Sequence, residues 1–197
     1  MDTLSDNLEL SLISNDTTSN MYQEIFSGLT TCKGFIFSVA FISYGGLQLL
    51  LRNFDQMKDS GVKGKILTSD YQHFTDPKAL RKLKEFSNIT TKIFLEETQG
   101  GFHTKAYIFD FEDHIKLYIG SSNITEKALL KNVEWNIKII SKKDNPFVDE
   151  IMEAFEILWN KTEVISEEFL DKYEAFINTL KEADRQRFQA FSEFNIF

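Results

Sequence analysis

Two stretches decide the fold of this chain: Gly100-Gly-Phe-His-Thr-Lys-Ala-Tyr-Ile-Phe-Asp110 and Lys116-Leu-Tyr-Ile-Gly-Ser-Ser-Asn123. The run from His103 to Asp110 has the composition of a β-strand, and alternation along a strand places His103 and Lys105 on one face. An imidazole and an ammonium therefore share one pocket. The short polar segment Phe111 to His114 predicts a turn, and Lys116 to Ile119 predicts a second strand that can pair with the first.

A bend rich in hydrogen-bond donors follows the second strand, at Gly120-Ser-Ser-Asn123. When the two strands pair, these hydroxyl and amide groups lie beside His103 and Lys105. A cation, a neutral amide and a hydroxyl without an acidic cluster suit an anion, and phosphate is the commonest anion that uses all three. The serines could equally be plain turn formers, and Asn123 could cap the next helix.

These residues resemble the phospholipase D superfamily, whose pattern is His-x-Lys, four residues, Asp, and then Gly-Ser-x-Asn. The pattern is filled in order by His103, Lys105, Asp110, Gly120, Ser121 and Asn123. Glu134 stands where nucleases of the superfamily have a carboxylate that orients the histidine. The sequence departs from the family in two ways: the gap between the aspartate and the glycine is longer than usual, and the motif appears only once.

The wider resemblance covers roughly residues 20 to 160. Three further stretches are similar to the phospholipase D-like domain at the N-terminus of some bacterial superfamily 2 helicases: Phe37-Ser-Val-Ala-Phe-Ile-Ser43, Ile66-Leu-Thr-Ser-Asp-Tyr71 and Asn132-Val-Glu-Trp-Asn136. This resemblance implies a nuclease module of a helicase or restriction-type protein, with ATP bound elsewhere in the full-length protein. The chain stops on Ile196-Phe197, as a segment excised ahead of a further domain would.

The resemblance also implies a phosphodiesterase mechanism in which His103 attacks phosphorus and forms a covalent phosphohistidine. A second His103 would protonate the leaving oxygen, so the single motif implies a homodimer with His103 at the two-fold axis. Lys105 and Asn123 would hold the non-bridging oxygens, with Ser121 assisting. Glu134 would accept the other imidazole N–H and fix its tautomer and orientation.

The remaining motif residue, Asp110, lies on the opposite strand face from His103 and is expected to be a structural hydrogen-bonding partner. No metal or other cofactor enters this scheme. Paired divalent ions would need an acidic cluster, and Glu96-Glu97 are adjacent residues that face opposite ways on a strand. We expect His73 and His114 to be unremarkable, although His114 repeats the His-x-Lys spacing.

Charge is distributed unevenly along the chain. The whole protein has a net charge of -8, but residues 61–143 hold 14 basic and 10 acidic residues, a net charge of +4. This basic third contains the motif and suits a nucleic-acid partner, with DNA favoured over RNA, although a solvated surface of mixed charge gives the same count. The single cysteine excludes an internal disulfide, and the absence of a signal segment or a membrane-spanning run predicts a cytoplasmic protein.

Strands and helices alternate along the chain, which predicts a phospholipase D-like α/β/α sandwich with a mixed central sheet and added C-terminal helices. We expect an N-terminal arm or edge strand (1–20), a phospholipase D-like domain (21–162) and a C-terminal helical segment leading to a further domain (163–197). The predicted strands span 35–42, 65–68, 91–95, 103–110, 116–119 and 133–140. The predicted helices span 22–29, 47–57, 77–86 and 126–131, and two more begin at Pro146 and after a cap at Ser166.

Metal-independent cleavage of nucleic acid is the function that these residues favour. Two alternatives stay open. The first is a catalytically inert nucleic-acid-binding module of a helicase, although every motif position is filled. The second is a phospholipid phosphodiesterase, which would use the same residues but is less suited to an acidic chain without a basic amphipathic face for a membrane surface.

Overall fold

A single mixed sheet of eight strands forms the centre of the computed structural model, which describes residues 8–16 and 19–193 and side chains as far as residue 185. The strand order is β1-β7-β6-β5-β2-β3-β4-β8. The strands are β1 (Glu9–Ile13), β2 (Gly34–Val39), β3 (Lys63–Ser69), β4 (Ile89–Phe94), β5 (Lys105–Asp110), β6 (His114–Gly120), β7 (Asn136–Lys142) and β8 (Glu163–Val164). The mixed sheet confirms the predicted fold class.

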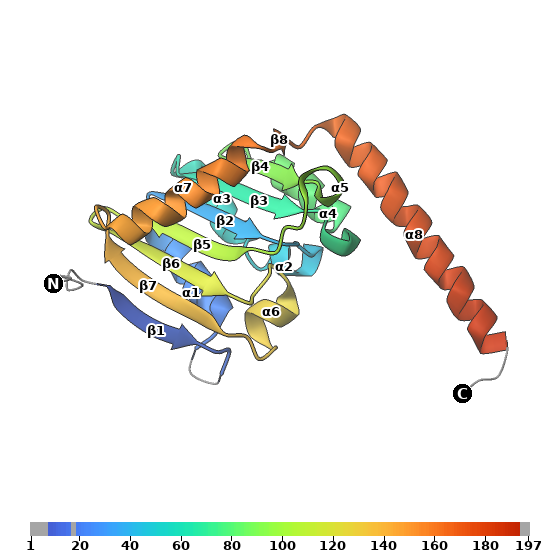
Figure 1. Ribbon diagram of the computed structural model, residues 1–197, viewed down its shortest axis with the longest axis horizontal. Helices are drawn as coiled ribbons and strands as arrows, with labels where there is room; N and C mark the ends of the chain where they lie inside the picture. Colours follow the sequence, from blue (N-terminus) through green and yellow to red (C-terminus); the bar gives the residue numbers. More distant parts are fainter. Residues whose placement is uncertain (1–7, 17–18, 194–197) are drawn as a thin grey trace.

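The helices flank this sheet on both faces (Figure 1). They are α1 (Met21–Thr31), α2 (Tyr44–Gln48), α3 (Leu51–Asp59), α4 (Pro77–Lys84), α5 (Glu96–Gln99), α6 (Glu126–Leu130), α7 (Pro146–Asn160) and α8 (Glu167–Glu193), with a 3₁₀ turn η1 at Tyr71–His73. Within the described residues, no helix is both long and apolar enough to cross a bilayer.

The strand directions bring the motif residues to one edge of the sheet. β2, β3 and β4 are parallel, whereas β5 is antiparallel to β2, β6 to β5, and β7 to β6. The carboxyl ends of β2, β3, β4 and β6 therefore meet the amino ends of β5 and β7. We call this the C-terminal edge; it holds Lys105, which begins β5, and Gly120, which ends β6.

Alternation along β5 divides the core into two layers. Phe109 is fully buried and belongs to the cluster formed with α1 and α3, whereas its neighbour Ile108 packs in the cluster that contains Val148 of α7. Phe37 of β2 contacts the Phe109 ring edge-on, with 5.6 Å between the ring centroids. Successive residues thus face opposite helix layers, as a strand buried on both faces requires.

Several predicted boundaries were wrong for identifiable reasons. The predicted helix 47–57 is two helices, and the first begins earlier because the Ser43 side chain caps it by accepting a hydrogen bond from the Gly46 N–H at 3.1 Å. Gly45 and Gly46 lie inside this first helix. Gly46 is needed there, since a Cβ atom at this position would lie 2.3 Å from the backbone oxygen of Ile124.

The two ends of the domain also join the sheet. The alternating leucines near the N-terminus form the edge strand β1, which pairs antiparallel with β7; residues 1–7 and 17–18 of the predicted arm lie outside the described residues. At the other end, β8 pairs with β4, and Ser166 caps α8 by accepting a hydrogen bond from the Phe169 N–H at 3.0 Å. The later part of α8 extends away from the sandwich (Figure 1).

Candidate active site

His103 and Lys105 form the centre of the site. His103 does not lie in the strand, as its sequence suggested, but two residues before β5, where it is exposed; Lys105 begins the strand and is only 6% exposed. The Lys105 Nζ lies 2.7 Å from the His103 Nδ1 and 2.9 Å from the His103 carbonyl oxygen. The predicted pairing of the two side chains is therefore present, with the imidazole open to solvent and the cation beneath it.

Two opposing influences act on the charge of Lys105. Burial lowers the pKa of its ammonium below the ordinary value, and the carboxylate of Glu134 partly counteracts this. A protonated ammonium can only donate hydrogen bonds, so its contact requires the His103 Nδ1 to accept. A neutral His103 in this arrangement carries its proton on Nε2.

The loop Gly120-Ser-Ser-Asn123 is held rigidly at the end of β6. Ser122 is fully buried; its hydroxyl accepts a hydrogen bond from the Asn136 side-chain amide at 2.8 Å, and its carbonyl accepts one from the Tyr107 hydroxyl at 2.9 Å. Gly120 lies opposite Asn136 in the β6–β7 pairing. Asn136 is therefore a positioning residue that the sequence analysis missed, although it lies in the Asn132–Asn136 stretch singled out there.

Asn123 is positioned to offer its amide to a ligand. It does not cap α6; the capping hydroxyl belongs to Thr125, which accepts from the Ala128 N–H at 3.1 Å. The Asn123 Oδ1 instead accepts a hydrogen bond from the Phe41 N–H at 3.3 Å, just beyond the end of β2. Its Nδ2 donates to none of the described residues, so both N–H groups are left for another acceptor.

Glu134 lies in the segment that precedes β7, not on a strand face, because β7 begins only at Asn136. It accepts a hydrogen bond from the Ser121 hydroxyl and a long one, 3.4 Å, from the Asn132 side chain. The Ser121 hydroxyl also accepts from the Trp135 N–H at 3.1 Å. Among the described residues, Glu134 thus contacts the motif serine, and no hydrogen bond joins it to His103.

Asp110 lies far from the other motif residues, at the opposite end of β5. Five residue steps separate it from Lys105, which is about 17 Å along a strand. Its carboxylate pairs there with the Lys143 Nζ at 2.6 Å. Asp110 belongs to the supporting structure of this end of the sheet, and we do not place it at the phosphate.

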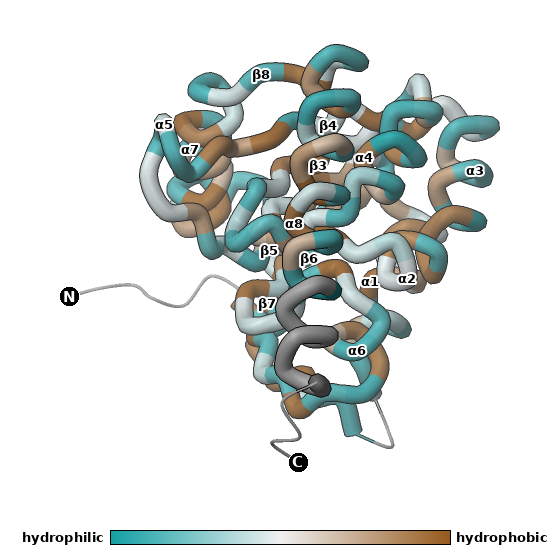
Figure 2. Tube along the Cα trace, turned by 90° about the vertical axis from the view of Figure 1, so that its right-hand side faces the viewer, coloured by the Kyte–Doolittle hydropathy of each residue, from teal (hydrophilic) through white to brown (hydrophobic). Residues whose placement is uncertain are grey.

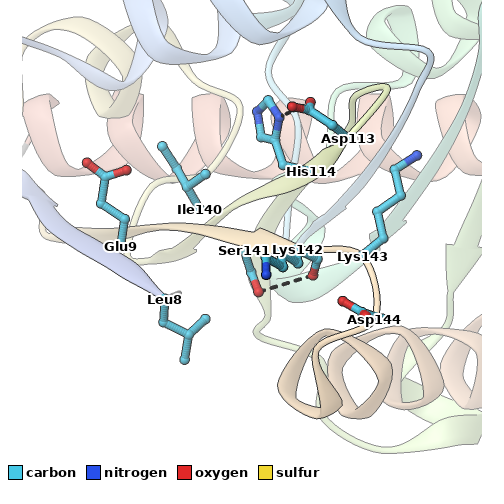
Figure 3. A pocket seen from close by; sticks show the side chains of 9 residues that line it. All are labelled: Leu8, Glu9, Asp113, His114, Ile140, Ser141, Lys142, Lys143 and Asp144. Atoms are coloured by element: carbon cyan, nitrogen blue, oxygen red, sulfur yellow. Dashed lines mark hydrogen bonds and ion pairs between the residues drawn. The ribbon is translucent and has the colours of Figure 1, made fainter. Parts of the chain in front are cut away.

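His114 lies at this remote end too. Figure 3 shows it beside an open pocket at the start of β6, with its Nδ1 2.7 Å from the Asp113 Oδ1. Its ring stacks on Phe111 with 4.5 Å between the centroids. The repeat of the His-x-Lys spacing therefore places His114 at the other end of β6 from the Gly120–Asn123 loop.

A cavity of about 340 Å³ opens between α7 and the C-terminal edge. His103, Lys105 and Gly120 line it on the sheet side, and Ile151 and Leu158 line it on the helix side. The cavity thus brings together an exposed imidazole and a buried ammonium, and this pair can bind an oxyanion and exchange a proton with it. Within the described residues, no three histidine, cysteine or acidic side chains are grouped in a way that could hold a metal ion.

Sequence comparison assigns the family. Residues 36–159 match the family described as "Cardiolipin synthase, PLD-like domain". The chain belongs to the phospholipase D-like family. The matched region is more than half of the chain and contains His103, Lys105, Asn123 and Glu134. No curated protein matches the chain.

Solved structures share the fold of this phospholipase D-like chain at low sequence identity. NucT from Helicobacter pylori is 14% identical with a TM-score of 0.60, and the alignment covers 81% of this chain and 100% of NucT. Nuc from Salmonella typhimurium, a phospholipase D family member, is 17% identical with a TM-score of 0.60, covering 82% and 100%. Phosphatidylserine synthase from Haemophilus influenzae is 11% identical with a TM-score of 0.64, covering 94% of this chain and 48% of the synthase.

Proposed function

We propose that this phospholipase D-like chain is a metal-independent phosphodiesterase that cleaves nucleic acid through a phosphohistidine on His103. The observation that carries the proposal is the contact between the exposed His103 imidazole and the buried Lys105 ammonium at 2.7 Å. An ammonium has three donors, and His103 takes two of them. The third donor and the two N–H groups of Asn123 are available for the non-bridging oxygens of a phosphodiester.

The reaction needs His103 in two different protonation states. In the first step one His103 nitrogen bonds to phosphorus, the bond to the leaving oxygen breaks, and a second His103 supplies the proton for that oxygen. Water then attacks phosphorus, breaks the P–N bond and returns its proton to the second histidine. The proton donor is the charged imidazolium, which carries a proton on both ring nitrogens, so in that copy Nδ1 no longer accepts from the Lys105 ammonium. The attacking histidine needs its proton on Nδ1, and Glu134 is the nearby carboxylate that could hold it there after releasing Ser121.

The second histidine would come from a second copy of the chain in a two-fold dimer. α7 covers only part of its face of the sheet. It leaves β1 and the start of β7 uncovered (Figure 1). Leu12 and Ile137 are paired there and are 55% and 51% exposed, and Trp135, next to Glu134, is 68% exposed. Exposed apolar side chains grouped beside an active site are typical of an interface. A two-fold contact would cover this surface on both copies at once and bring the two sites together.

Nucleic acid is the substrate that the sequence supports. The basic third of the chain, with a net charge of +4, includes the whole site, and three stretches resemble the nuclease-like domain of certain helicases. We infer from that resemblance that the chain acts as a module of a helicase or restriction-type protein. The family description and the synthase among the similar structures make phospholipid the competing substrate, so the experiment includes it.

The test incubates end-labelled oligonucleotides and, in parallel, phosphatidylglycerol vesicles with the protein in excess EDTA. We expect cleavage of the oligonucleotides by the wild type and by His114→Ala, whose imidazole lies at the remote end of β6, and none by His103→Ala. Activity that disappears in EDTA and returns with magnesium would overturn the mechanism. Hydrolysis of the vesicles alone would overturn the substrate assignment.

A further inference from the structure

Three aromatic side chains lie together at the C-terminal edge, beside the histidine. Phe41 follows β2, and Tyr71 and Phe74 lie in the loop after β3; we call the three the aromatic platform. The centroid of Phe41 lies 5.4 Å from that of Phe74 and 6.4 Å from that of Tyr71. The Tyr71 ring is also 4.8 Å from the His103 ring, so the aromatic platform is continuous with the reacting side chain.

The loop that presents the aromatic platform is strained. Gln72 and His73 both have positive φ angles, 44° and 60°, which residues with a side chain adopt only at a cost. The loop is nevertheless fixed: the Thr75 hydroxyl donates to the Ser69 carbonyl at 2.6 Å, and the Tyr173 hydroxyl of α8 donates to the Thr75 carbonyl at 3.0 Å. Strain held in place by several hydrogen bonds is typical of functional segments.

Burial of apolar surface does not account for this arrangement. Phe74 is 53% exposed, although a phenylalanine is stabilising mainly when it is removed from water. Gln72 and His73 beside it are exposed as well, and the ring contact of His73 is with Phe176, which is itself 45% exposed. The loop therefore maintains an aromatic surface in solvent, within reach of a ligand that is bound at His103.

We propose that the aromatic platform stacks a nucleobase of the strand whose phosphate is bound at His103, which makes single-stranded nucleic acid the substrate. The inference rests on the proposed function and specifies its substrate class. Aromatic side chains that line a phosphate-binding site stack on unpaired bases whatever their sequence. The bases of a duplex are stacked on one another inside the helix, so their faces cannot reach Phe74 and Tyr71.

The test compares three substrates of equal length: a single strand, the same strand in a duplex, and a strand of abasic sites with the same number of phosphates. We expect the wild type to favour the single strand in kcat/KM over both others. Phe74→Ala should reduce the preference for the base-containing strand over the abasic strand about 10-fold, since one stacked base contributes that order of discrimination. The control Phe26→Ala removes a phenylalanine that is 40% exposed on α1, away from the site, and should leave the preference unchanged.

Three results would overturn the aromatic platform as a base-binding surface. The first is equal cleavage of the duplex and the single strand. The second is a loss of activity in Phe74→Ala that is equal on the base-containing and the abasic strand. The third is a loss of vesicle binding in Phe74→Ala while the preference for the base-containing strand is unchanged. Fluorescence anisotropy with the same labelled strands separates this inference from the proposed function. A protein that cleaves neither strand but binds the base-containing one more tightly, in a Phe74-dependent way, would refute the phosphodiesterase and keep the aromatic platform.

Discussion

At the scale of single residues, the charge of Lys105 determines how the site should respond to pH. Only a protonated Lys105 can hold a phosphate oxygen, so phosphate binding should weaken as pH rises through its pKa. Burial lowers that pKa, and the Glu134 carboxylate counteracts the shift. The alkaline limit of phosphate binding by this ammonium should therefore lie below the ordinary lysine value of 10.5.

Removing the Glu134 charge should move this limit to still lower pH. In Glu134→Gln the influence that raises the Lys105 pKa is lost, so the pH above which the protein no longer binds inorganic phosphate shifts downward. Turnover at the optimum should also fall, by about 10²-fold, as it does when a group that orients a functional side chain is removed. The control is Glu156→Gln, which removes a carboxylate that pairs with Lys65 at 2.6 Å. An alkaline limit of phosphate binding that stays in place or moves upward in Glu134→Gln would show that the two charges do not interact.

Residue spacing predicted part of this site and missed the rest. The i, i+2 spacing correctly placed His103 beside Lys105. Side chains continue to alternate between the two faces in the extended residues just before a strand. The contact of Tyr71 with His103 could not be predicted, since it joins loops that follow different strands. The prediction of a strand over 133–140 also placed Glu134 wrongly. The alternating sequence pattern begins before β7 does, in a segment that is not a strand and is held by hydrogen bonds to Ser121.

At the scale of elements, the close approach of β6 and β7 builds the phosphate-binding loop. A Cβ atom on Gly120 would lie 2.1 Å from the Trp135 carbonyl oxygen and 2.6 Å from the Asn136 Cα. Both are backbone atoms, so a larger residue must push the two strands apart. The loop with Ser121 and Asn123 would move with them.

Gly120→Ala should therefore reduce both stability and activity. We expect the free energy of unfolding, measured by urea denaturation, to fall by about 1–3 kcal/mol, the usual cost of overpacking. Oligonucleotide cleavage should fall more steeply than the folded fraction. The matched control is Gly101→Ala, since a Cβ atom there meets nothing within 4 Å. Equal stability of the two variants would mean that the strands tolerate the extra carbon.

Helix and strand types were more predictable than their limits. Asp76 and Pro77 predicted the start of α4, and the Asp76 side chain does accept from the Lys78 N–H at 2.9 Å. Such local capping can be read from neighbouring residues. The break between α2 and α3 has no such signal, because α3 begins after Leu50, which makes no side-chain capping hydrogen bond.

At the scale of the whole molecule, α8 extends from the sandwich and passes in front of the C-terminal edge when the molecule is viewed from that side (Figure 2). Its first turns are anchored to α4, where Arg81 pairs with Asp171 at 2.7 Å and with Glu174 at 2.8 Å. Phe176 contacts His73 edge-on at 4.9 Å between ring centroids. The helix is thus attached to the same loop that carries the aromatic platform.

The central claim is that one active site is built from two His103 side chains in a two-fold dimer. The chain supplies one motif histidine, and neither His73 nor His114 has its partners: His73 contacts Phe176, and His114 lies at the remote end of the sheet. The two His103 imidazoles would act in different protonation states, one neutral as the nucleophile and one charged as the proton donor.

The most direct measurement is the turnover of mixed dimers. Wild type and His103→Ala chains with different affinity tags are co-expressed, the heterodimer is purified through both tags, and its cleavage of a labelled oligonucleotide is compared with that of wild type. A heterodimer of wild type with His114→Ala serves as the matched control and should keep full activity. We predict that the His103→Ala heterodimer loses nearly all turnover, because its single site lacks one of the two histidines. Half of the wild-type activity in that heterodimer, or a monomer in sedimentation that still cleaves, would contradict the account.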